Sequence, residues 1–355
     1  MKSRMYISSE NLKYNVNYIK NKIGNKQIIA MVKANAYGLG SKCVSTELQK
    51  YGINNFGVAN IDEAIELRKN GITGMIIVTG VLEANEIDMA IENDISISVS
   101  DYDNVVEISN IGKRLNKSAK IHLKIDTGMT RLGFTCNKVL ELWNSIIKLE
   151  NIDIQGIYTH LSCADKDEEY TLEQIEKFTS VVKELSKNYK FKYIHILNSD
   201  GIEKYSNKIN IDTHVRAGIM LYGYTGNTKP VTKLTSPIIH INDIKSTSKV
   251  GYGGTFVAKP NMKIAVVKIG YADGISRCLS NNITVKVNGN ICDQVGNICM
   301  DLMMIDVTNV KDVKINDEVV IWNYNNDLKQ IAQKSNKIVY EVISNIGNRV
   351  ERIIE

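Results

Sequence analysis

The sequence predicts an α/β protein made of an N-terminal (β/α)8 barrel followed by a mainly β C-terminal domain. From Gln27 to Gly223, short β-rich runs alternate with longer segments whose apolar residues have helical spacing, which is typical of βα units around a parallel sheet. After Thr225 the pattern changes to alternating residues and glycine-bearing turns, which favour antiparallel strands. The first part holds eight β-rich runs, and eight strands with intervening helices over this length favour a barrel.

Each predicted barrel strand is a short run, and the segments between the runs have the pattern of helices. IDEAIELRKNG and TLEQIEKFTSVVKELSKN, for example, carry apolar residues at helical spacing and Gly or Asn near their ends. The predicted strands are QIIAMVKA ending at Ala34, NFGVAN at 55–60, GMIIVTG at 74–80, ISISVS at 95–100, KIHLKID at 120–126, DIQGIYTH at 153–160, YIHILN at 193–198 and HVRAGIMLYG at 214–223.

We expect the barrel to span residues 1–230 and the second domain residues 231–355, with the N-terminal residues as a candidate addition to the second domain. A stretch with Pro230 and Pro237 leads into KIAVVKIGYADG, ITVKVNG, ICDQVGNICMDLMMIDVT and DEVVIW, so β structure should begin near residue 235. The segment LKQIAQKSNKIVYEVISNIG is then predicted to form one or two closing helices.

The composition is that of an ordinary globular protein and excludes several classes of function. A chain of 355 residues with 43% hydrophobic residues can bury a large core. The net charge of +5 is spread along the chain, which is a poor match to nucleic-acid binding. The start lacks a signal-peptide core and no segment has the pattern of a membrane span, so we expect a cytoplasmic protein. Six cysteines without paired spacing indicate reduced thiols, and five scattered histidines predict no metal site.

Lys33 ends the apolar run IIAMV at the end of the first predicted strand. The carboxyl ends of barrel strands surround the one open mouth of the fold, so its amine should project into a partly desolvated site. Desolvation and cationic neighbours lower the pKa of a lysine, which suits Schiff-base chemistry. Taken alone, Lys33 fits a surface lysine at a strand end better.

The phrase MVKANAYGLG at residues 31–40 resembles the cofactor-lysine motif of alanine racemases, and further blocks of that family recur in order along nearly the whole chain. The resemblance implies a pyridoxal-phosphate-dependent racemase of fold type III that supplies D-amino acids for the cell wall. The blocks are KIDTGMTRLGF at 124–134, THLSCAD at 159–165, HILNSDG at 195–201, VRAGIMLYG at 215–223, VGYGGTF at 250–256, IGYADGISR at 269–277 and GNICMDLMMIDVT at 296–308.

The resemblance assigns the proton transfers to Lys33 and Tyr252. A racemase must remove a proton from one face of a planar carbanion and deliver one to the other, so it needs two such groups. Lys33 would bind pyridoxal 5'-phosphate and act on one face, and Tyr252 would act on the other. A phenol with a pKa of about 10 is a weak base at neutral pH. The family pattern therefore points to His160 as its polarising neighbour.

The resemblance also assigns the residues that hold the cofactor. Arg216 matches the arginine that faces the pyridine nitrogen, where its permanent charge keeps that nitrogen unprotonated, and His195 would support it. The alternative for Arg216 is a salt bridge to Asp212. The phosphate ligands would be Tyr37, Ser199, the backbone amides of Gly218 and Ile219, and the residue at position 348, which is Asn348. The alternatives are an ordinary turn glycine at Gly218 and a helix N-cap at Ser199.

Five residues match positions that contact substrate in the family. Arg131 would orient the carboxylate, the backbone at Met300 and Asp301 would contact substrate, and Tyr271 matches an access-channel tyrosine. Lys124 matches a position that is carbamylated in many relatives, where the added negative charge fixes the arginine.

Tyr252, Tyr271 and Met300 all lie in the predicted β domain, whereas Lys33 lies in the barrel. In the family the second domain of one subunit completes the site of the other. The resemblance therefore implies a head-to-tail homodimer with shared sites.

The sequence departs from the family pattern near the C-terminus, where it reads NRVER. Asn348 stands where the family often has a tyrosine, and Glu351 where proline is usual. Asparagine is smaller and offers both a donor and an acceptor, so it fits a site that binds a hydroxymethyl group. This resembles the serine racemases of vancomycin-resistance clusters, so serine stays as the alternative substrate to alanine. Leu39 and Ala217 also replace the usual histidine and proline.

Two further classes remain as alternatives. A non-catalytic pyridoxal-phosphate-binding barrel would share the lysine but lack the second domain and Tyr252. A pyridoxal-phosphate decarboxylase on a barrel with a β domain would need a glycine-rich phosphate loop near the last strands, and no such loop is found.

Overall fold

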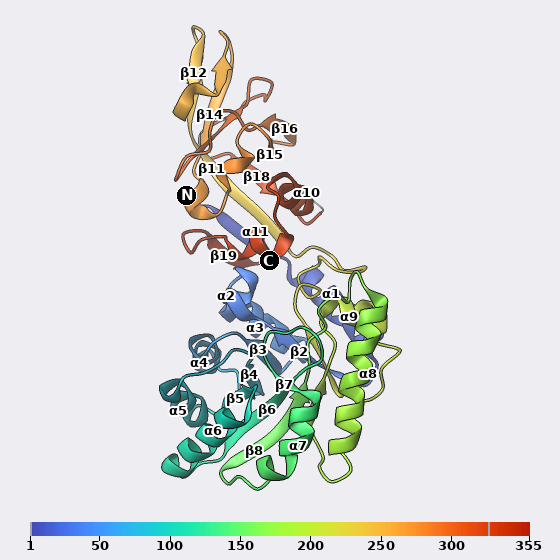
Figure 1. The fold of residues 1–355 in the computed structure, drawn as a ribbon. Coiled ribbons are helices and arrows are strands. Elements are labelled where there is room, and N and C mark those ends of the chain that lie inside the picture. The colour runs from blue at the N-terminus through green and yellow to red at the C-terminus, as the bar shows by residue number, and fades with distance from the viewer. Residues whose placement is uncertain (1, 326) are drawn as a thin grey trace. The chain divides into compact units, whose positions relative to one another are not determined.

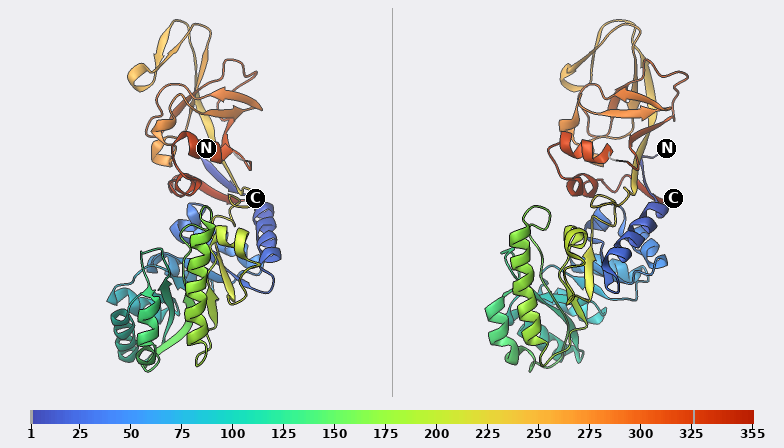
Figure 2. Two further views of the ribbon diagram at one scale, coloured as in Figure 1. Left: turned by 45° about the vertical axis from the view of Figure 1, so that its right-hand side comes forward. Right: turned by 90° about the vertical axis from the view of Figure 1, so that its right-hand side faces the viewer.

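The computed structural model describes residues 2–325 and 327–355. The chain divides into two compact units. One unit contains residues 13–36 and 44–228, and the other contains the residues up to Leu12 together with residues 37–43 and 229–355. Figures 1 and 2 show the course of the chain through both units.

The first unit is a closed barrel of parallel strands, which confirms the predicted fold. Within the described part of the chain, eight strands pair in the order of the sequence, and the last pairs with the first to close the barrel. A short strand, β7 (Phe134–Thr135), is added beside β6. The barrel strands are β2 (Gln27–Met31), β3 (Asn55–Val58), β4 (Ile76–Val78), β5 (Ser96–Val99), β6 (Ala119–Asp126), β8 (Ile152–Tyr158), β9 (Tyr193–His195) and β10 (His214–Ala217).

The strands β4 and β5 are buried along their whole length because helices cover the outer face of a parallel barrel and side chains fill its interior. Two predicted strands are longer than the observed ones. The run at 214–223 is a strand only to Ala217, since Gly218 begins a turn in which its carbonyl accepts from the amide of Leu221. Lys33 and Ala34 likewise lie beyond the end of β2.

Most helices in the barrel region follow strands and begin at capping side chains. The side chains of Asn60, Asp101, Thr135 and Asp167 accept backbone N–H groups at the starts of α4, α6, α7 and α8. Each of these four helices buries one apolar face, as the helical spacing predicts. The helices are α1 (Ser9–Ile23), α3 (Ser41–Lys50), α4 (Ile61–Lys69), α5 (Ala84–Glu92), α6 (Tyr102–Leu115), α7 (Cys136–Ile146), α8 (Glu168–Leu185) and α9 (Ser199–Tyr205).

The second unit is mainly β, and its largest sheet is organised around one long strand. Strand β11 pairs antiparallel with β1, β14 and β18, and β1 pairs in parallel with β19, so both ends of the chain enter this sheet. The strands are β1 (Arg4–Ile7), β11 (Thr232–Asp243), β12 (Ser248–Val250), β13 (Phe256–Ala258), β14 (Lys263–Val267), β15 (Thr284–Val287), β16 (Asn290–Asp293), β17 (Met303–Asp306), β18 (Glu318–Trp322) and β19 (Glu351–Ile354).

Two helices close this unit, as the sequence predicts: α10 (Asp327–Lys334) and α11 (Val339–Ser344). No helix among the described residues is long and apolar enough to cross a membrane. The described residues also contain no group of three His, Cys, Asp or Glu side chains placed to hold a metal ion.

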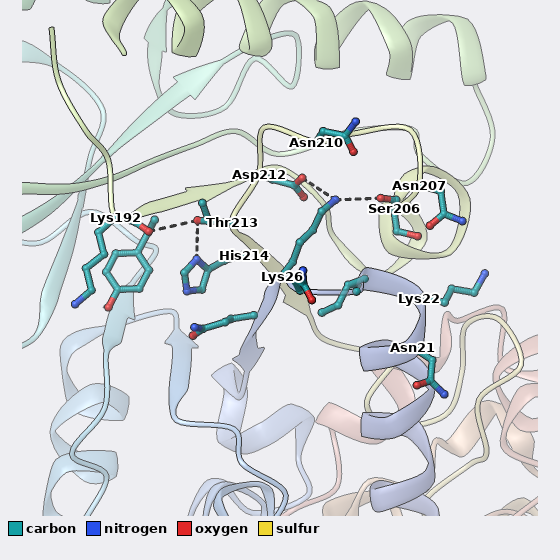
Figure 3. Close-up of a pocket in the computed structure, with 15 residues that line it drawn as sticks. Asn21, Lys22, Lys26, Lys192, Ser206, Asn207, Asn210, Asp212, Thr213 and His214 are labelled. Carbon is teal, nitrogen blue, oxygen red and sulfur yellow. Dashed lines mark hydrogen bonds and ion pairs between the residues drawn. The ribbon is translucent and has the colours of Figure 1, made fainter. Parts of the chain in front are cut away.

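A polar cavity of about 850 Å³ opens at the amino ends of β2 and β10 (Figure 3). Lys26, Asp212, Thr213 and His214 line it, and Lys26 forms an ion pair with Asp212 at 2.8 Å. The sequence predicts the active site at the carboxyl ends of the strands. The cavity lies at the opposite end of the barrel and is therefore separate from that site.

Candidate active site

The barrel brings the predicted barrel residues together at the carboxyl ends of its strands. Lys33 follows β2, Lys124 lies in β6, His160 follows β8, and Arg216 lies in β10. Arg216 and His160 approach each other to 3.4 Å, and the charge of Arg216 acts on both lysines. The residues are therefore one electrostatic cluster at the mouth of the barrel.

Lys33 begins a left-handed turn, α2 (Lys33–Tyr37). Ala34, Asn35 and Ala36 have φ values of 51°, 53° and 52°. For L-residues this conformation costs roughly 1–2 kcal/mol each, so the rest of the fold must hold the turn in place.

The carboxylate of Glu63 holds this turn from the start of α4. Its two oxygens accept the amide of Ala34 at 2.6 Å and the amide of Ala59 at 2.8 Å. One side chain thereby joins the ends of two neighbouring barrel strands next to the cofactor lysine of the predicted site. Glu63 was not identified from the sequence, although Asn60 and Glu63 match the N-cap and the acidic third position of a capping box.

The Lys33 amine has a lowered pKa, as expected from the sequence. Desolvation is the largest cause, and the positive charges of Arg131 and Arg216 add to it. The negative charge of Glu63 acts in the opposite direction and raises the pKa. A lysine with a lowered pKa presents more of the neutral amine that attacks a carbonyl.

Lys124 is buried, and its amine lies 5.7 Å from the centre of the Tyr158 ring. Burial is the largest of the causes that lower its pKa to about 8, and Arg131 is the next. Arg131 is exposed in the loop after β6. Asp126 shapes the start of that loop, since its carboxylate accepts three successive amides at 3.0–3.1 Å.

Arg216 is 4% exposed and is held by a dense set of acceptors. Its guanidinium donates to the carbonyls of His195 at 2.7 Å, Thr159 at 2.6 Å and Ile196 at 3.0 Å, and to Nδ1 of His195 at 2.8 Å. Burial lowers its pKa to about 10, so it stays charged at neutral pH. The alternative of a salt bridge to Asp212 is wrong, because Asp212 pairs with Lys26.

His160 lies beside Arg216 and is neutral at physiological pH. Burial is the first cause that lowers its pKa to about 3, and the charges of Arg216 and Arg131 follow. A neutral imidazole can accept or donate a hydrogen bond without adding charge to the site.

Ser199 links the start of α9 to the turn after β10. Its buried hydroxyl accepts the amides of Gly218 at 3.1 Å and Met220 at 3.3 Å. The amide of Ile219, between these two, has no acceptor in the described part of the chain. The alternative of Ser199 as a helix N-cap is wrong, because Asn198 caps α9 by accepting the amide of Gly201.

The second unit carries the remaining predicted residues, and several of these are exposed. Tyr252 opens a 3-10 turn and is 72% exposed, and Asn297 donates to its carbonyl at 2.8 Å. Tyr271 and Met300 are also exposed, and backbone hydrogen bonds join their two loops. This unit therefore presents two tyrosines and a methionine on connected surface loops, which we call the tyrosine loops (residues 251–255, 270–274 and 297–301).

Asp301 is the last residue of the third tyrosine loop, and Asn348 lies beside these loops. Arg349 pairs with Asp301 at 2.8 Å and with Asp273 at 2.9 Å, which places the neighbouring Asn348 at their edge. Tyr37 is packed against Tyr340 with ring centres 6.0 Å apart, and burial raises its pKa to about 12.

His122 and Tyr158 also belong to the barrel cluster and were not identified from the sequence. The ring of Tyr158 stacks on His195 at 4.7 Å and lies 5.1 Å from the guanidinium carbon of Arg216. The signal for His122 was present in the strand KIHLKID, because alternation places residue 122 on the same strand face as Lys124.

The barrel, the activated lysine and the buried arginine define an enzyme of the pyridoxal-phosphate-dependent barrel class. Residues 7–226 match the family model for the N-terminal domain of alanine racemase, and residues 231–354 match the model for its C-terminal domain. The chain belongs to the alanine racemase family.

Relatives and solved structures agree with this placement along the full chain. The chain is 38% identical to the alanine racemase of Clostridium kluyveri over 98% of this chain and 92% of that protein. It is 39% identical to that of Fusobacterium nucleatum over all of both chains. The solved structure of the Clostridium difficile 630 alanine racemase superposes with a TM-score of 0.94 and 33% identity, covering 100% of this chain and 96% of that chain.

Proposed function

We propose that this protein interconverts L- and D-alanine with pyridoxal 5'-phosphate by a two-base mechanism. The observation that carries the proposal is Lys33 at the barrel mouth: burial and the charges of Arg131 and Arg216 lower the pKa of its amine, and the Glu63 carboxylate holds the turn that Lys33 begins. The relatives named above, alanine racemases at 38–39% identity, support alanine as the substrate.

The barrel residues fit the cofactor. Lys33 would hold it covalently through Nζ, the Arg216 guanidinium would face the ring nitrogen, and Ser199 with the free amide of Ile219 would receive the phosphate, with Gly218 as a further ligand. Tyr37, four residues after Lys33 and outside the barrel unit, would be another phosphate ligand. A charged guanidinium cannot give up a proton to that nitrogen at neutral pH, which limits side reactions of a more electron-poor ring. When bound, the cofactor supplies the electron sink that makes the α-proton of an amino acid acidic.

The two proton-transfer groups would be Lys33 Nζ on one face of the substrate and the Tyr252 hydroxyl on the other. His160, neutral beside Arg216, would serve as a hydrogen-bond partner that polarises the phenol. Arg131 would bind the substrate carboxylate, and the backbone at Met300 and Asp301 would contact the substrate.

Tyr252 would act in the site of a second copy of the chain. Its 72% exposure supports this, because a phenol that transfers protons needs a desolvated environment that the exposed turn does not supply. The proposal therefore includes a head-to-tail homodimer whose tyrosine loops complete the partner's barrel site. It also places the enzyme in the cytoplasm, where D-alanine would be made.

Lys124 would be carbamylated. Its pKa of about 8 makes the neutral amine, the form that reacts with carbon dioxide, accessible near neutral pH, and the product would exchange a positive charge near Arg131 for a negative one. Extra density on the Lys124 amine in a crystal structure would support this, and a bare amine would reject it.

The direct test is the purified protein loaded with pyridoxal 5'-phosphate. We expect a visible absorption band that borohydride removes and that Lys33→Ala lacks, together with loss of optical rotation in L-alanine. A protein with the band but no racemisation would be a non-catalytic binder, and carbon dioxide release would identify a decarboxylase.

Serine is the second candidate substrate, and Asn348 is the observation that favours it. Its amide could bind a hydroxymethyl group where a tyrosine is usual. Comparing kcat/KM for L-alanine and L-serine decides between the two.

A further inference from the structure

Three polar side chains form a continuous chain through the interior of the barrel, starting at Arg216. The guanidinium lies 2.8 Å from Nδ1 of His195, and Nε2 of His195 lies 3.0 Å from Nδ1 of His122. Both imidazoles have no exposed surface. We call this set the arginine–histidine chain (Arg216, His195 and His122).

The arginine fixes the direction of every hydrogen bond in this chain. A guanidinium can only donate, so Nδ1 of His195 accepts and its proton must be on Nε2. That proton is donated to Nδ1 of His122, which places the His122 proton on its own Nε2. Burial lowers the pKa of His122 to about 3, and that of His195 is also far below its usual value, so both rings are neutral.

The strand structure makes room for His122 specifically. The pairing of β6 with β8 shifts its register between Ile121 and His122, and Gly156 stands opposite His122. A Cβ atom at Gly156 would lie 2.4 Å from Nδ1 of His122, so no other residue fits there without displacing the ring. The ring of Tyr193 stacks on His122 at 5.1 Å and holds its plane.

Stability does not account for this arrangement. Nε2 of His122 has no hydrogen-bond partner among the described protein atoms, and a buried polar group of that kind costs roughly 1–3 kcal/mol. Apolar side chains of similar volume would fill the barrel interior at lower cost. The arginine–histidine chain is therefore better explained by a need to hold Arg216 in place in the proposed site.

We propose that His122 is a positioning residue for Arg216, which it holds through the tautomer of His195. This rests on the proposed function, in which Arg216 faces the ring nitrogen of the cofactor. Without the acceptor on His122, His195 would lose the partner of its Nε2 proton. Its other tautomer would place a proton on Nδ1 against the arginine donor, and the guanidinium would have to move.

The tautomers can be read directly by nitrogen NMR of the full-length holoenzyme labelled with 15N-histidine. The protein has only five histidines, so single substitutions assign every signal. We expect His195 and His122 both to carry their proton on Nε2 and to stay neutral from pH 5 to pH 9, bounds that are set about 1.5 units below and 2.5 units above the usual histidine pKa. A proton on Nδ1 of His195, or titration of either ring in that range, would overturn the proposal.

Two substitutions at one position then test the function of the chain. His122→Phe keeps a ring but removes the acceptor, and kcat for alanine should fall about tenfold with KM nearly unchanged. His122→Asn places an oxygen near the former Nδ1 and should recover most of kcat. His214→Phe is the matched control, since His214 is a buried imidazole outside the arginine–histidine chain (Figure 3). Its ring packs on Tyr193, which also stacks on His122, so this variant perturbs the same packing without removing a member of the chain; kcat should be unchanged.

Equal kcat in His122→Phe and wild type would contradict the proposal, and so would an equal loss in His214→Phe, which would indicate general packing. If His122→Phe fails to fold, the wild-type tautomers still decide. If the wild-type protein does not racemise alanine, the proposed function fails, whereas the NMR result continues to test the arginine–histidine chain by itself.

Discussion

The barrel half and the tyrosine-loop half of the proposed site differ in how far contacts within one protomer bury and fix their functional side chains. In the barrel, Arg216 is buried among acceptors, Lys124 has a strongly lowered pKa, and Lys33 sits on a turn that Glu63 holds. On the tyrosine loops, Tyr252 is 72% exposed and Met300 is 53% exposed. The barrel half is therefore preorganised within one protomer, and the tyrosine half needs a second surface to become a catalytic environment.

The largest effect is expected at Lys33, the residue on which the barrel half depends. Lys33→Ala should lose the cofactor absorption band and reduce kcat/KM by about 10³-fold or more, because it removes both the covalent link and one proton-transfer group. Absorption spectra and polarimetry measure both quantities. Appreciable turnover without Lys33 would refute the assignment of this amine.

A substitution at Lys124 tests whether burying this charged amine in the barrel lowers the stability of the fold, as its lowered pKa indicates. The folded pKa of about 8 lies below the usual 10.5, so the unfolded chain binds the proton more tightly and stability should rise as the pH increases from about 8 to 10.5. Lys124→Met should therefore be more stable than the wild type at pH 7, by on the order of 3 kcal/mol, and this gain should shrink above pH 8.

Denaturant unfolding in bicarbonate-free buffer, which excludes carbamylation, makes that measurement. Lys120→Met on the same strand is the control and should not gain stability, since it loses an ion pair with Asp94. A gain at Lys124 that does not depend on pH would show that packing, not charge, sets the cost.

Glu63 tests the preorganisation of the lysine turn. Glu63→Gln keeps only one accepting oxygen for the two amides, so the free energy of unfolding should fall by about 1–2 kcal/mol. Loss of the negative charge should also lower the pKa of Lys33 further, which moves the pH dependence of cofactor loading to lower pH. Reconstitution rates measured against pH test this, with Asp62→Asn as the control; identical profiles would argue against an electrostatic role.

The smallest effect is expected on the tyrosine side, at Asn348. Asn348→Tyr should shift the ratio of kcat/KM for L-alanine over L-serine toward alanine by about tenfold, because it removes an amide that can bind a hydroxyl group. Parallel kinetics on both amino acids give this ratio. An unchanged ratio would remove Asn348 from any role in substrate choice.

Alternation and helical spacing were enough to predict the barrel and the β domain, because each residue pattern reports the local period of its own segment. Strand ends were predicted less well. The run after His214 is apolar to Tyr222 except for Arg216, yet Gly218 turns the chain so that the amides of Gly218 and Met220 point to Ser199.

The order of the sequence blocks placed Lys33, His160 and Arg216, and the structure groups them at the barrel mouth. The order of the blocks did not reveal the residues that hold these side chains in place, Glu63 and His122. Glu63 bonds to Ala34 across 29 positions, and His122 bonds to His195 across 73. Spacing along the chain does not encode such contacts; closure of the barrel creates them.

The most direct test of the central claim mixes two inactive variants. Lys33→Ala protomers keep an intact Tyr252, and Tyr252→Ala protomers keep an intact barrel site, so hybrid dimers should contain one complete site. We predict that racemase activity returns after subunit exchange. A mixture that stays inactive, although mass spectrometry shows hybrid dimers, would contradict the claim that one protomer's phenol completes its partner's barrel.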